Sequence, residues 1–340
     1  MPVPHAPKER PPRVLVTTPY LEPGGEVDRL LRDAGLETVF ARRADREATG
    51  RTLTDCVADV AGVVAGTDAF SAEVIRAAPG LKVFGRCGVG YDNIDVAAAT
   101  RQGIAVTCTP GTNRISVAEH VLALMLNCAR RIPRNLTAVR SGGWPQESGR
   151  ELYGTTLGVV GLGSIGKTVA RAALALGMRV VAHDPRLDED FLAETGVEAR
   201  TVEGVLAEAD FLTLHLSLDD TTRHLIDAAA LRRMKPDAYL INTARGGVVD
   251  EDALADAVEA GRLAGAALDV TECEPLPPGS RLRTLDAVLV TAHIGAATVE
   301  ARARSGAMAA RQVIDVLAGR APAHLVNPEY ASAASGVGAL

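Results

Sequence analysis

Short apolar runs alternate with amphipathic stretches along most of this chain. Near the start, the apolar runs "RVLVTT" and "LETVFA" flank the helix-like "EVDRLLRDAG", within residues 13–41. Two more apolar runs, "AGVVAG" at 61–66 and "LKVFGRCG" at 81–88, flank the amphipathic "SAEVIRAA". Buried strands that alternate with helices are typical of a parallel sheet covered by helices on both faces. This part of the chain therefore predicts a first α/β unit.

The same alternation restarts at residue 156 with "TLGVVGLGSIGKTVARAALALGMRVVAHDP". Further strand-like runs are "ADFLTLHLSL", "AYLINTARGG", "LAGAALDV" and "AVLVTAHIG". A helix expected over 298–319 follows the last of these strands, which indicates a crossover back to the first unit. We therefore predict an α/β protein with two doubly wound parallel-sheet domains, the second inserted in the first.

The segment between the two units, "ISVAEHVLALMLNCARRIP", predicts a helix. Ser116 and Glu119 have the spacing of a capping box, and Pro133 marks the expected end. Apolar residues surround most of this helix, so we expect burial on more than one side, with a subunit interface as a natural partner. Residues 134–155 show little periodicity and predict an extended arm.

Composition excludes several classes of protein. The 340 residues favour two domains, and the net charge of −6 gives no basic surface for nucleic acid. No uncharged apolar run approaches the roughly 18 residues of a membrane span. The five cysteines are scattered and odd in number, which predicts a reducing cytoplasm and neither a disulfide framework nor a metal site. Residues 1–12 and 331–340 are expected to be disordered.

The strongest local motif is Gly161-x-Gly163-x-x-Gly166, which follows a predicted strand and opens a predicted helix. Such glycines permit a tight turn and close approach of a pyrophosphate to the helix N-terminus. Asp184, at the end of the next strand, can bond the adenosine ribose hydroxyls and would repel a 2′-phosphate. The motif predicts a site for NAD, although Arg186 nearby leaves NADP open.

Four polar residues fall at the carboxyl ends of consecutive predicted strands, where ligands bind in open α/β sheets. They are Arg245, Asp269, Glu274 and His293. An imidazole suits proton exchange near neutral pH, a neighbouring carboxylate can hold the ring, and a guanidinium can clamp a carboxylate. Together they predict hydride transfer between a nicotinamide and a 2-hydroxy acid/2-oxo acid couple.

At this point the sequence resembles the D-isomer-specific 2-hydroxyacid dehydrogenase family, in its 3-phosphoglycerate dehydrogenase-like branch. The resemblance covers roughly residues 60–327 and rests on "GRCGVGYDNIDVAAATRQGIAV", "TPGTN", "GLGSIG", "INTARGGVVDEDAL", "ALDVTECEP" and "HIGAAT". It implies a Rossmann NAD-binding domain at 113–297, with a dimerisation helix and arm. That domain would be inserted in a flavodoxin-like substrate (lid) domain at 13–112 and 298–327. It also implies a homodimer.

The resemblance also implies roles for individual residues. Arg245 would bind the substrate, Glu274 would partner the histidine, and His293 would be the acid/base. The loop Arg86, Cys87, Gly88 and Val89 would meet the substrate and nicotinamide through backbone N–H groups. The NAD site would comprise Gly161, Gly163, Ser164, Ile165, Gly166, Asp184, Leu216, Thr243, Ala244, Asp269, Gly295 and Ala296.

The identity of the acid stays open at this stage. Phosphoglycerate enzymes usually carry a Ser/Arg/Thr-type stretch where this chain has Ala65-Gly66-Thr67-Asp68. The alternative is a glyoxylate or hydroxypyruvate reductase, which shares the same catalytic residues. Formate dehydrogenases are disfavoured because they carry Gln where Glu274 stands. A third hypothesis, from a different class, is an NAD-sensing corepressor that binds peptides.

Overall fold

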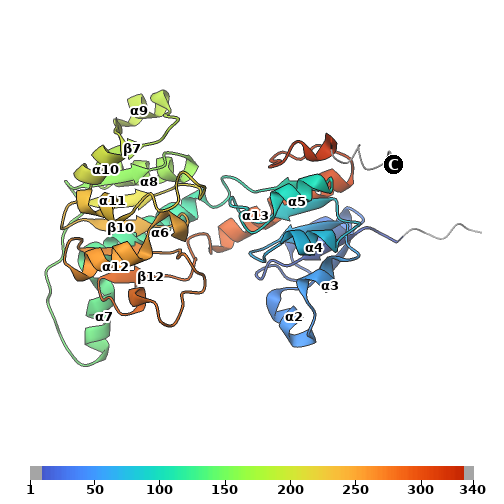
Figure 1. Ribbon diagram of the computed structural model, residues 1–340, viewed down its shortest axis with the longest axis horizontal. Coiled ribbons are helices and arrows are strands. Elements are labelled where there is room, and N and C mark those ends of the chain that lie inside the picture. Colours follow the sequence, from blue (N-terminus) through green and yellow to red (C-terminus); the bar gives the residue numbers. More distant parts are fainter. Residues whose placement is uncertain (1–9, 333–340) are drawn as a thin grey trace, which may run out of the picture. The chain divides into compact units, whose positions relative to one another are not determined.

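The computed structural model describes residues 10–332, and the chain divides into two units (Figure 1). Unit 2 spans Arg114–Thr298, and unit 1 comprises the described residues before Arg114 and after Thr298. The disorder expected at 1–12 and 331–340 falls mostly outside the described residues. Inside them, the amide of Glu37 donates to the Pro12 carbonyl at 3.0 Å, and the amide of Ser332 donates to the Glu329 carbonyl at 3.1 Å.

Unit 1 is built on a five-stranded sheet of order β2-β1-β3-β4-β5 in which every pairing is parallel. This is the flavodoxin-like order of a doubly wound sheet. The strands are β1 (Arg13–Val16), β2 (Glu37–Phe40), β3 (Gly62–Ala65), β4 (Val83–Arg86) and β5 (Ala105–Thr107). The helices are α1 (Glu26–Asp33), α2 (Arg43–Thr49), α3 (Leu53–Val57), α4 (Ala72–Arg76), α5 (Val96–Arg101) and α13 (Val299–Leu317).

Two apolar layers cover the sheet of unit 1. One joins Leu15, Val63 and Phe84 to residues of α3, α4 and α5, and the other joins Val14 and Val64 to residues of α1 and α13. α13 follows unit 2 in the sequence but belongs to unit 1, where it completes the second layer (Figure 1). A Cβ added at Gly85 would lie 2.7 Å from the Ala309 carbonyl oxygen, so the glycine allows α13 to pack directly on β4.

Unit 2 contains a seven-stranded parallel sheet of order β12-β11-β10-β9-β6-β7-β8. Its strands are β6 (Thr156–Val160), β7 (Arg179–His183), β8 (Glu198–Ala199), β9 (Phe211–Leu214), β10 (Tyr239–Asn242), β11 (Gly265–Leu268) and β12 (Val288–Val290). The chain order reverses at the β6–β9 neighbours, as in a Rossmann fold, and such a switch point is where dinucleotides bind.

Helices cover both faces of this sheet. The helices are α6 (Arg114–Arg130), α7 (Ile132–Arg140), α8 (Ser164–Ala175), α9 (Glu189–Thr195), α10 (Val202–Glu208), α11 (Ala228–Arg233) and α12 (Glu251–Glu259), with 3₁₀ turns η1 (Gly246–Val248) and η2 (Arg281–Arg283). α6, α8 and α9 contribute to one apolar layer, and α10, α11 and α12 contribute to the other. Asp250 caps α12, because its carboxylate accepts a hydrogen bond from the amide of Ala253 at 3.0 Å.

Three local predictions between the units are wrong, the last of them in part. The helix expected to begin at a Ser116 cap begins at Arg114, so Ser116 lies within its first turn and its hydroxyl pairs with that of Thr298 at 2.8 Å. Pro133 does not end this helix. Arg131 does, with a left-handed φ of +52°, and Pro133 lies in the first turn of α7, where a missing N–H costs nothing. The expected extended arm is therefore helical as far as Arg140.

No described helix is long and apolar enough to cross a membrane. Within the described residues, no group of three or more His, Cys, Asp or Glu side chains is arranged to hold a metal ion.

Candidate functional site

The glycine loop follows β6 at the switch point of unit 2. Gly161 has φ +98°, and a Cβ there would overlap the carbonyl of His215. A Cβ at Gly166 would overlap the carbonyl of Gly161, so this glycine allows α8 to lie close to the strand. A Cβ at Gly163 would meet no protein atom within 4 Å, and Gly163 is the N-cap of α8. The loop therefore leaves open space over a helix N-terminus, which fits a pyrophosphate.

Asp184 follows β7 and faces this loop. Its carboxylate accepts hydrogen bonds from the backbone amides of Leu162 and Arg186, each at 2.8 Å. The first of these bonds ties the carboxylate to the glycine loop. The sequence placed Asp184 where a ribose would lie, and the fold brings it to the same edge of the sheet.

The ends of β9 and β10 continue this edge. Leu216 follows β9, and its Cδ2 would lie 3.2 Å from a Cβ on Gly161. Thr243 and Ala244 follow β10, where Asn242 accepts from the amide of Ala244 at 3.0 Å and donates to the carbonyl of Arg245 at 2.9 Å. The hydroxyl oxygen of Thr243 is buried and has no hydrogen-bond partner among the described residues. A polar group of a bound dinucleotide would supply one, so these residues fit an NAD site.

His293 and Glu274 form a hydrogen-bonded pair beyond the ends of β12 and β11. Nδ1 of His293 lies 2.8 Å from Oε2 of Glu274. Burial alone would raise the pKa of the Glu274 carboxyl. The hydrogen bond and charge of His293, with a contribution from the charge of Arg245, outweigh it and hold that pKa below its usual range. Glu274 is therefore ionised at neutral pH, and Nε2 of His293 can exchange a proton with a ligand.

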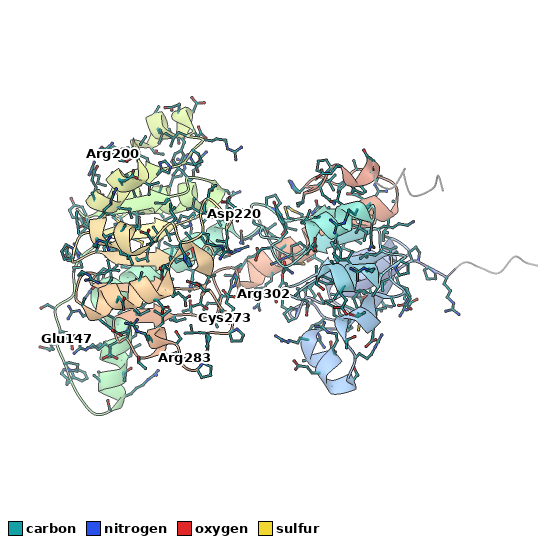
Figure 2. All side chains as sticks on the ribbon, in the orientation of Figure 1. Glu147, Arg200, Asp220, Cys273, Arg283 and Arg302 are labelled. Carbon is teal, nitrogen blue, oxygen red and sulfur yellow. The ribbon has the colours of Figure 1, made fainter. Side chains whose placement is uncertain are left out.

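Arg245 and Glu274 are brought together by a close backbone approach. A Cβ at Gly246 would overlap the backbone of Thr271, so only glycine lets the loop after β11 pack on the loop after β10. Nη1 of Arg245 donates to the carbonyl of Ala244 at 2.7 Å. Thr271 holds the next loop, because its hydroxyl donates to the carbonyl of Cys273 at 2.9 Å (Cys273 is labelled in Figure 2).

Asp269 accepts hydrogen bonds from the loop that carries His293. Its carbonyl accepts from the amide of His293, and its carboxylate accepts from the amides of Ile294 and Gly295, at 2.7–2.8 Å. The hydroxyl of Thr291 also donates to it, at 2.5 Å. Burial alone would raise the pKa of this carboxyl. Hydrogen bonds from His120, Thr291 and the two amides outweigh that effect and lower the pKa to about 2.

The sequence reasoning missed three polar residues of this arrangement: His120, Asn242 and Thr291. Asn242 gave a detectable signal, since an amide in the buried strand "YLIN" must find partners. Thr291 and His120 gave none, because their roles depend on contacts between segments far apart in the chain.

The predicted substrate loop lies in unit 1, at the end of β4. The amide of Cys87 donates to the Ala65 carbonyl at 3.0 Å, and the amide of Gly88 donates to the Thr109 hydroxyl at 2.8 Å. Nε of Arg86 donates to the Asn93 side chain at 3.2 Å. Val89 is 40% exposed. The first part of this loop is thus held by bonds within unit 1.

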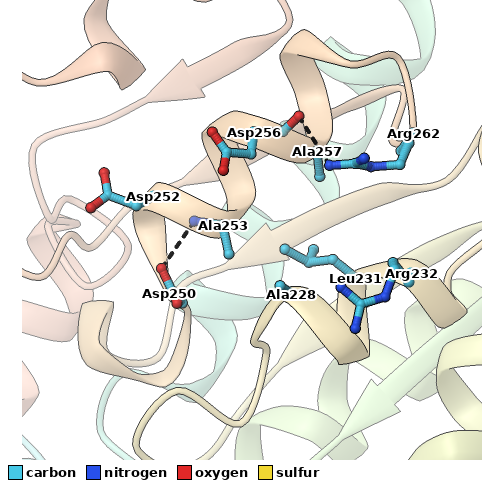
Figure 3. A pocket seen from close by; sticks show the side chains of 9 residues that line it. All are labelled: Ala228, Leu231, Arg232, Asp250, Asp252, Ala253, Asp256, Ala257 and Arg262. Carbon is cyan, nitrogen blue, oxygen red and sulfur yellow. Dashed lines mark hydrogen bonds between the residues drawn. The ribbon is translucent and has the colours of Figure 1, made fainter.

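A separate cavity of about 390 Å³ lies between α11 and α12 (Figure 3). Asp250, one of its carboxylates, caps α12, and Asp256 pairs with Arg281 at 2.8 Å. None of the predicted site residues lines it. This cavity is therefore not the candidate site. The lining comprises Ala228, Leu231, Arg232, Asp250, Asp252, Ala253, Asp256, Ala257 and Arg262.

Comparison with known proteins identifies the class that this fold and site define. Residues 122–295 match the model of the NAD binding domain of the D-isomer specific 2-hydroxyacid dehydrogenases. The chain is 44% identical over 269 residues to a glyoxylate reductase of Korarchaeum cryptofilum, covering 77% of this chain and 81% of that one. The chain therefore belongs to the D-isomer specific 2-hydroxyacid dehydrogenase family, and its unit 2 contains the family's NAD-binding domain.

Other relatives carry different names. A D-3-phosphoglycerate dehydrogenase of Methanocaldococcus jannaschii is 42% identical over 318 residues, which cover 93% of this chain. The chain spans only 59% of that relative, and 46% of the corresponding enzyme of Synechocystis. Among solved structures, a D-lactate dehydrogenase of Aquifex aeolicus, complexed with NAD and lactic acid, is 29% identical with a TM-score of 0.81. The match covers 92% of this chain and 98% of that one.

Proposed function

We propose that this protein interconverts a D-2-hydroxy acid and its 2-oxo acid by NAD-dependent hydride transfer. The observation that carries the proposal is the 2.8 Å pair of His293 and Glu274 beside Arg245, at the carboxyl edge of an NAD-binding sheet. A structural role alone requires neither an imidazole held by an ionised carboxylate nor a guanidinium at that edge.

His293 is the proposed acid/base. In the oxidative direction Nε2 takes the proton of the substrate hydroxyl, while the carbon that bears this hydroxyl loses a hydride to the nicotinamide, so that a carbonyl forms. In the reductive direction the same nitrogen returns the proton to the carbonyl oxygen. The bound nicotinamide supplies or accepts the hydride. Glu274 fixes the ring through Nδ1 and stabilises the imidazolium that forms.

Arg245 is the proposed clamp for the substrate carboxylate. A guanidinium presents two parallel N–H groups to a carboxylate and stays charged at every relevant pH. Its charge next to the carbonyl carbon also favours the developing negative charge on oxygen during reduction. The loop Arg86–Val89 of unit 1 is proposed to contribute the remaining contacts to the acid.

Two candidates are proposed for the particular acid. The names of the phosphoglycerate dehydrogenases favour a 3-phosphoglycerate-like substrate. Glyoxylate or hydroxypyruvate is the second candidate, supported by relatives of those names of which this chain spans 81% and 80%. The segment Ala65–Asp68 also favours the second candidate. It contains no cation that could bind a phosphate, and the charge of Arg46 beside it is already paired with Asp68.

A panel of 2-oxo acids with and without phosphate, scored by NADH oxidation, tests the proposal. Turnover of at least one panel member is expected, and the ratio of kcat/KM values for the phosphorylated and unphosphorylated acids separates the two candidates. Absence of turnover on every member, with NADH still bound, would contradict the enzyme and favour a corepressor-like binding protein.

Assembly and location are part of the same proposal. We propose a homodimer through unit 2, supported by exposed apolar side chains on α6, α7 and the segment after α7. These are Ile115, Leu126, Ile132, Leu136, Val139 and Trp144. A cytoplasmic location is supported by the five cysteines, whose side chains form no disulfide in the structure.

A further inference from the structure

His120 reaches from α6 to the loop that carries His293. Its Nε2 lies 3.2 Å from the hydroxyl of Thr291 and 3.2 Å from Oδ1 of Asp269. Thr291 gives its own proton to Asp269, so Nε2 of His120 must carry the hydrogen that both oxygens share. The side chain of His120 is 16% exposed. A helix outside the catalytic loops thus donates into the buried end of the site.

Packing independently joins the same ring to the same loop. A Cβ built on Gly295 would lie 3.6 Å from Cδ2 of His120 and 3.0 Å from Oδ2 of Asp269. The ring therefore lies next to position 295, where an added methyl group would press on the Asp269 carboxylate and lie in ordinary contact with His120. His120 is thus placed beside this loop by its carbon atoms as well as by its N–H.

The loop needs this support because His293 has an unusual backbone conformation. Its φ is +53°, in the left-handed region, which costs a residue with a Cβ about 1–3 kcal/mol. Asp269 holds it through three consecutive amides: its backbone carbonyl accepts from His293, and its carboxylate accepts from Ile294 and Gly295. The two bonds to Ile294 and Gly295 require one orientation of the carboxylate. Thr291 and His120 are the side chains that fix this orientation.

We propose that His120 is a positioning residue for the acid/base: it orients Asp269, which sets the backbone of His293 and so the contact of that imidazole with Glu274. His120 itself does not touch the substrate. The kinetic consequence rests on the proposed function, and the positional consequence does not. Residues that orient metal ligands by such hydrogen bonds typically contribute about 10–100-fold to activity, and we expect a similar range for His120.

Two substitutions separate the N–H of His120 from its volume. His120→Phe keeps a ring and removes the donor, whereas His120→Gln keeps an N–H donor at similar reach. For His120→Phe we expect kcat to fall about 10–100-fold, with the KM of the 2-oxo acid and the Kd of NADH changed less than about threefold. His120→Gln should restore kcat to within about fivefold. Loss in both variants alike, or loss confined to KM, would overturn the proposal.

Thr291→Val tests the same carboxylate from the other side without touching α6. Its kcat should fall like that of His120→Phe, and the double variant should lose less than the product of the two single losses. Independent, multiplicative losses would contradict a shared action through Asp269. Asn127→Ala is the matched control on α6, because Asn127 donates to the carbonyl of Ala123 in its own helix and should leave kcat unchanged.

A measurement that does not depend on turnover tests the positioning role of His120 separately from the proposed enzymatic function. In protein labelled with ¹⁵N-histidine, the Nδ1–H resonance bonded to Glu274 is assigned by its loss in His293→Ala. It should shift or broaden in His120→Phe and in Thr291→Val, and return in His120→Gln. An unchanged resonance in the first two variants would overturn the positioning role. If the unmodified protein turned over no 2-oxo acid, the proposed function would fail while this measurement still decided the inference.

Discussion

Single residues of this site are held by specific partners. His293 combines a left-handed backbone with a side chain fixed by Glu274, and Arg245 follows the buried amide of Asn242. Neither the imidazole nor the guanidinium is needed to cover apolar core. Their removal should therefore change the chemistry far more than the stability of the fold.

His293→Ala should lower turnover by about two orders of magnitude or more and leave the affinity for NADH nearly intact, because proton exchange loses its only proposed donor. Steady-state kinetics and fluorescence titration with NADH measure the two effects. Glu274→Gln is the informative companion, since it keeps a hydrogen-bond acceptor for the ring and removes the charge. Near-normal turnover in His293→Ala would refute the acid/base assignment.

Asp184 should determine the choice of cofactor. Its carboxylate would repel the 2′-phosphate of NADP, so Asp184→Asn should raise the ratio of kcat/KM for NADPH to that for NADH by about tenfold. Asn keeps an acceptor for the amide of Leu162, whereas Asp184→Ala also removes this tie to the glycine loop. A preference for NADPH in the unmodified protein would contradict the ribose argument.

At the scale of elements, the ends of β10, β11 and β12 build the site together. The loops after β10 and β11 are in contact at Gly246. The loop after β12 is held by hydrogen bonds to Asp269, which follows β11. Each proposed catalytic side chain comes from a different strand end. A change in any one of these contacts should therefore alter the positions of the neighbouring loops.

The buried carboxylate of Asp269 should make stability sensitive to acid. Its folded-state pKa of about 2 lies below the ordinary value of 3.8, so its stabilisation is complete above about pH 4 and is lost as the pH falls toward 2. The contribution to the free energy of unfolding is about 2–3 kcal/mol. Asp269→Asn should flatten urea-unfolding stability between pH 4 and pH 2. An unchanged pH dependence would show that other carboxylates cause the acid sensitivity.

The sequence predicted most strands of both sheets, because buried parallel strands are short apolar runs between turn residues. It also predicted the glycine loop, whose spacing reflects local backbone requirements. It failed around Arg131, where one left-handed residue ends the helix that Pro133 was expected to end, and a second helix follows where an extended arm was expected. It gave no sign of His120, since a histidine in an apolar helix looks the same whether or not it meets a carboxylate.

At the scale of the whole molecule, α6 joins the loop of His293 to a surface with exposed apolar residues. His120 lies on the inner side of α6, whereas Leu126 on the same helix and Leu136 on α7 are 42% and 50% exposed. Such side chains are characteristic of a protein–protein interface. This arrangement supports the proposed dimer.

Leu136→Arg should convert the dimer to a monomer, because an interface core tolerates an uncompensated charge poorly. Light scattering after size exclusion measures the mass of each species. Arg302→Glu, an exposed charge change in unit 1, is the control that should leave the mass unchanged. A monomeric unmodified protein, or a dimer that persists in Leu136→Arg, would contradict the proposed interface.

The sequence by itself determined the two α/β units, the glycine loop and the strand ends that carry Arg245, Glu274 and His293. These follow from local patterns, namely apolar runs, turn glycines and the rule that ligands bind at carboxyl strand ends. Only the tertiary structure decided which donors hold Asp269, why His293 can keep a left-handed backbone, and that Gly246 must be a glycine. Those features depend on contacts between residues far apart in the chain, and no local pattern records such contacts.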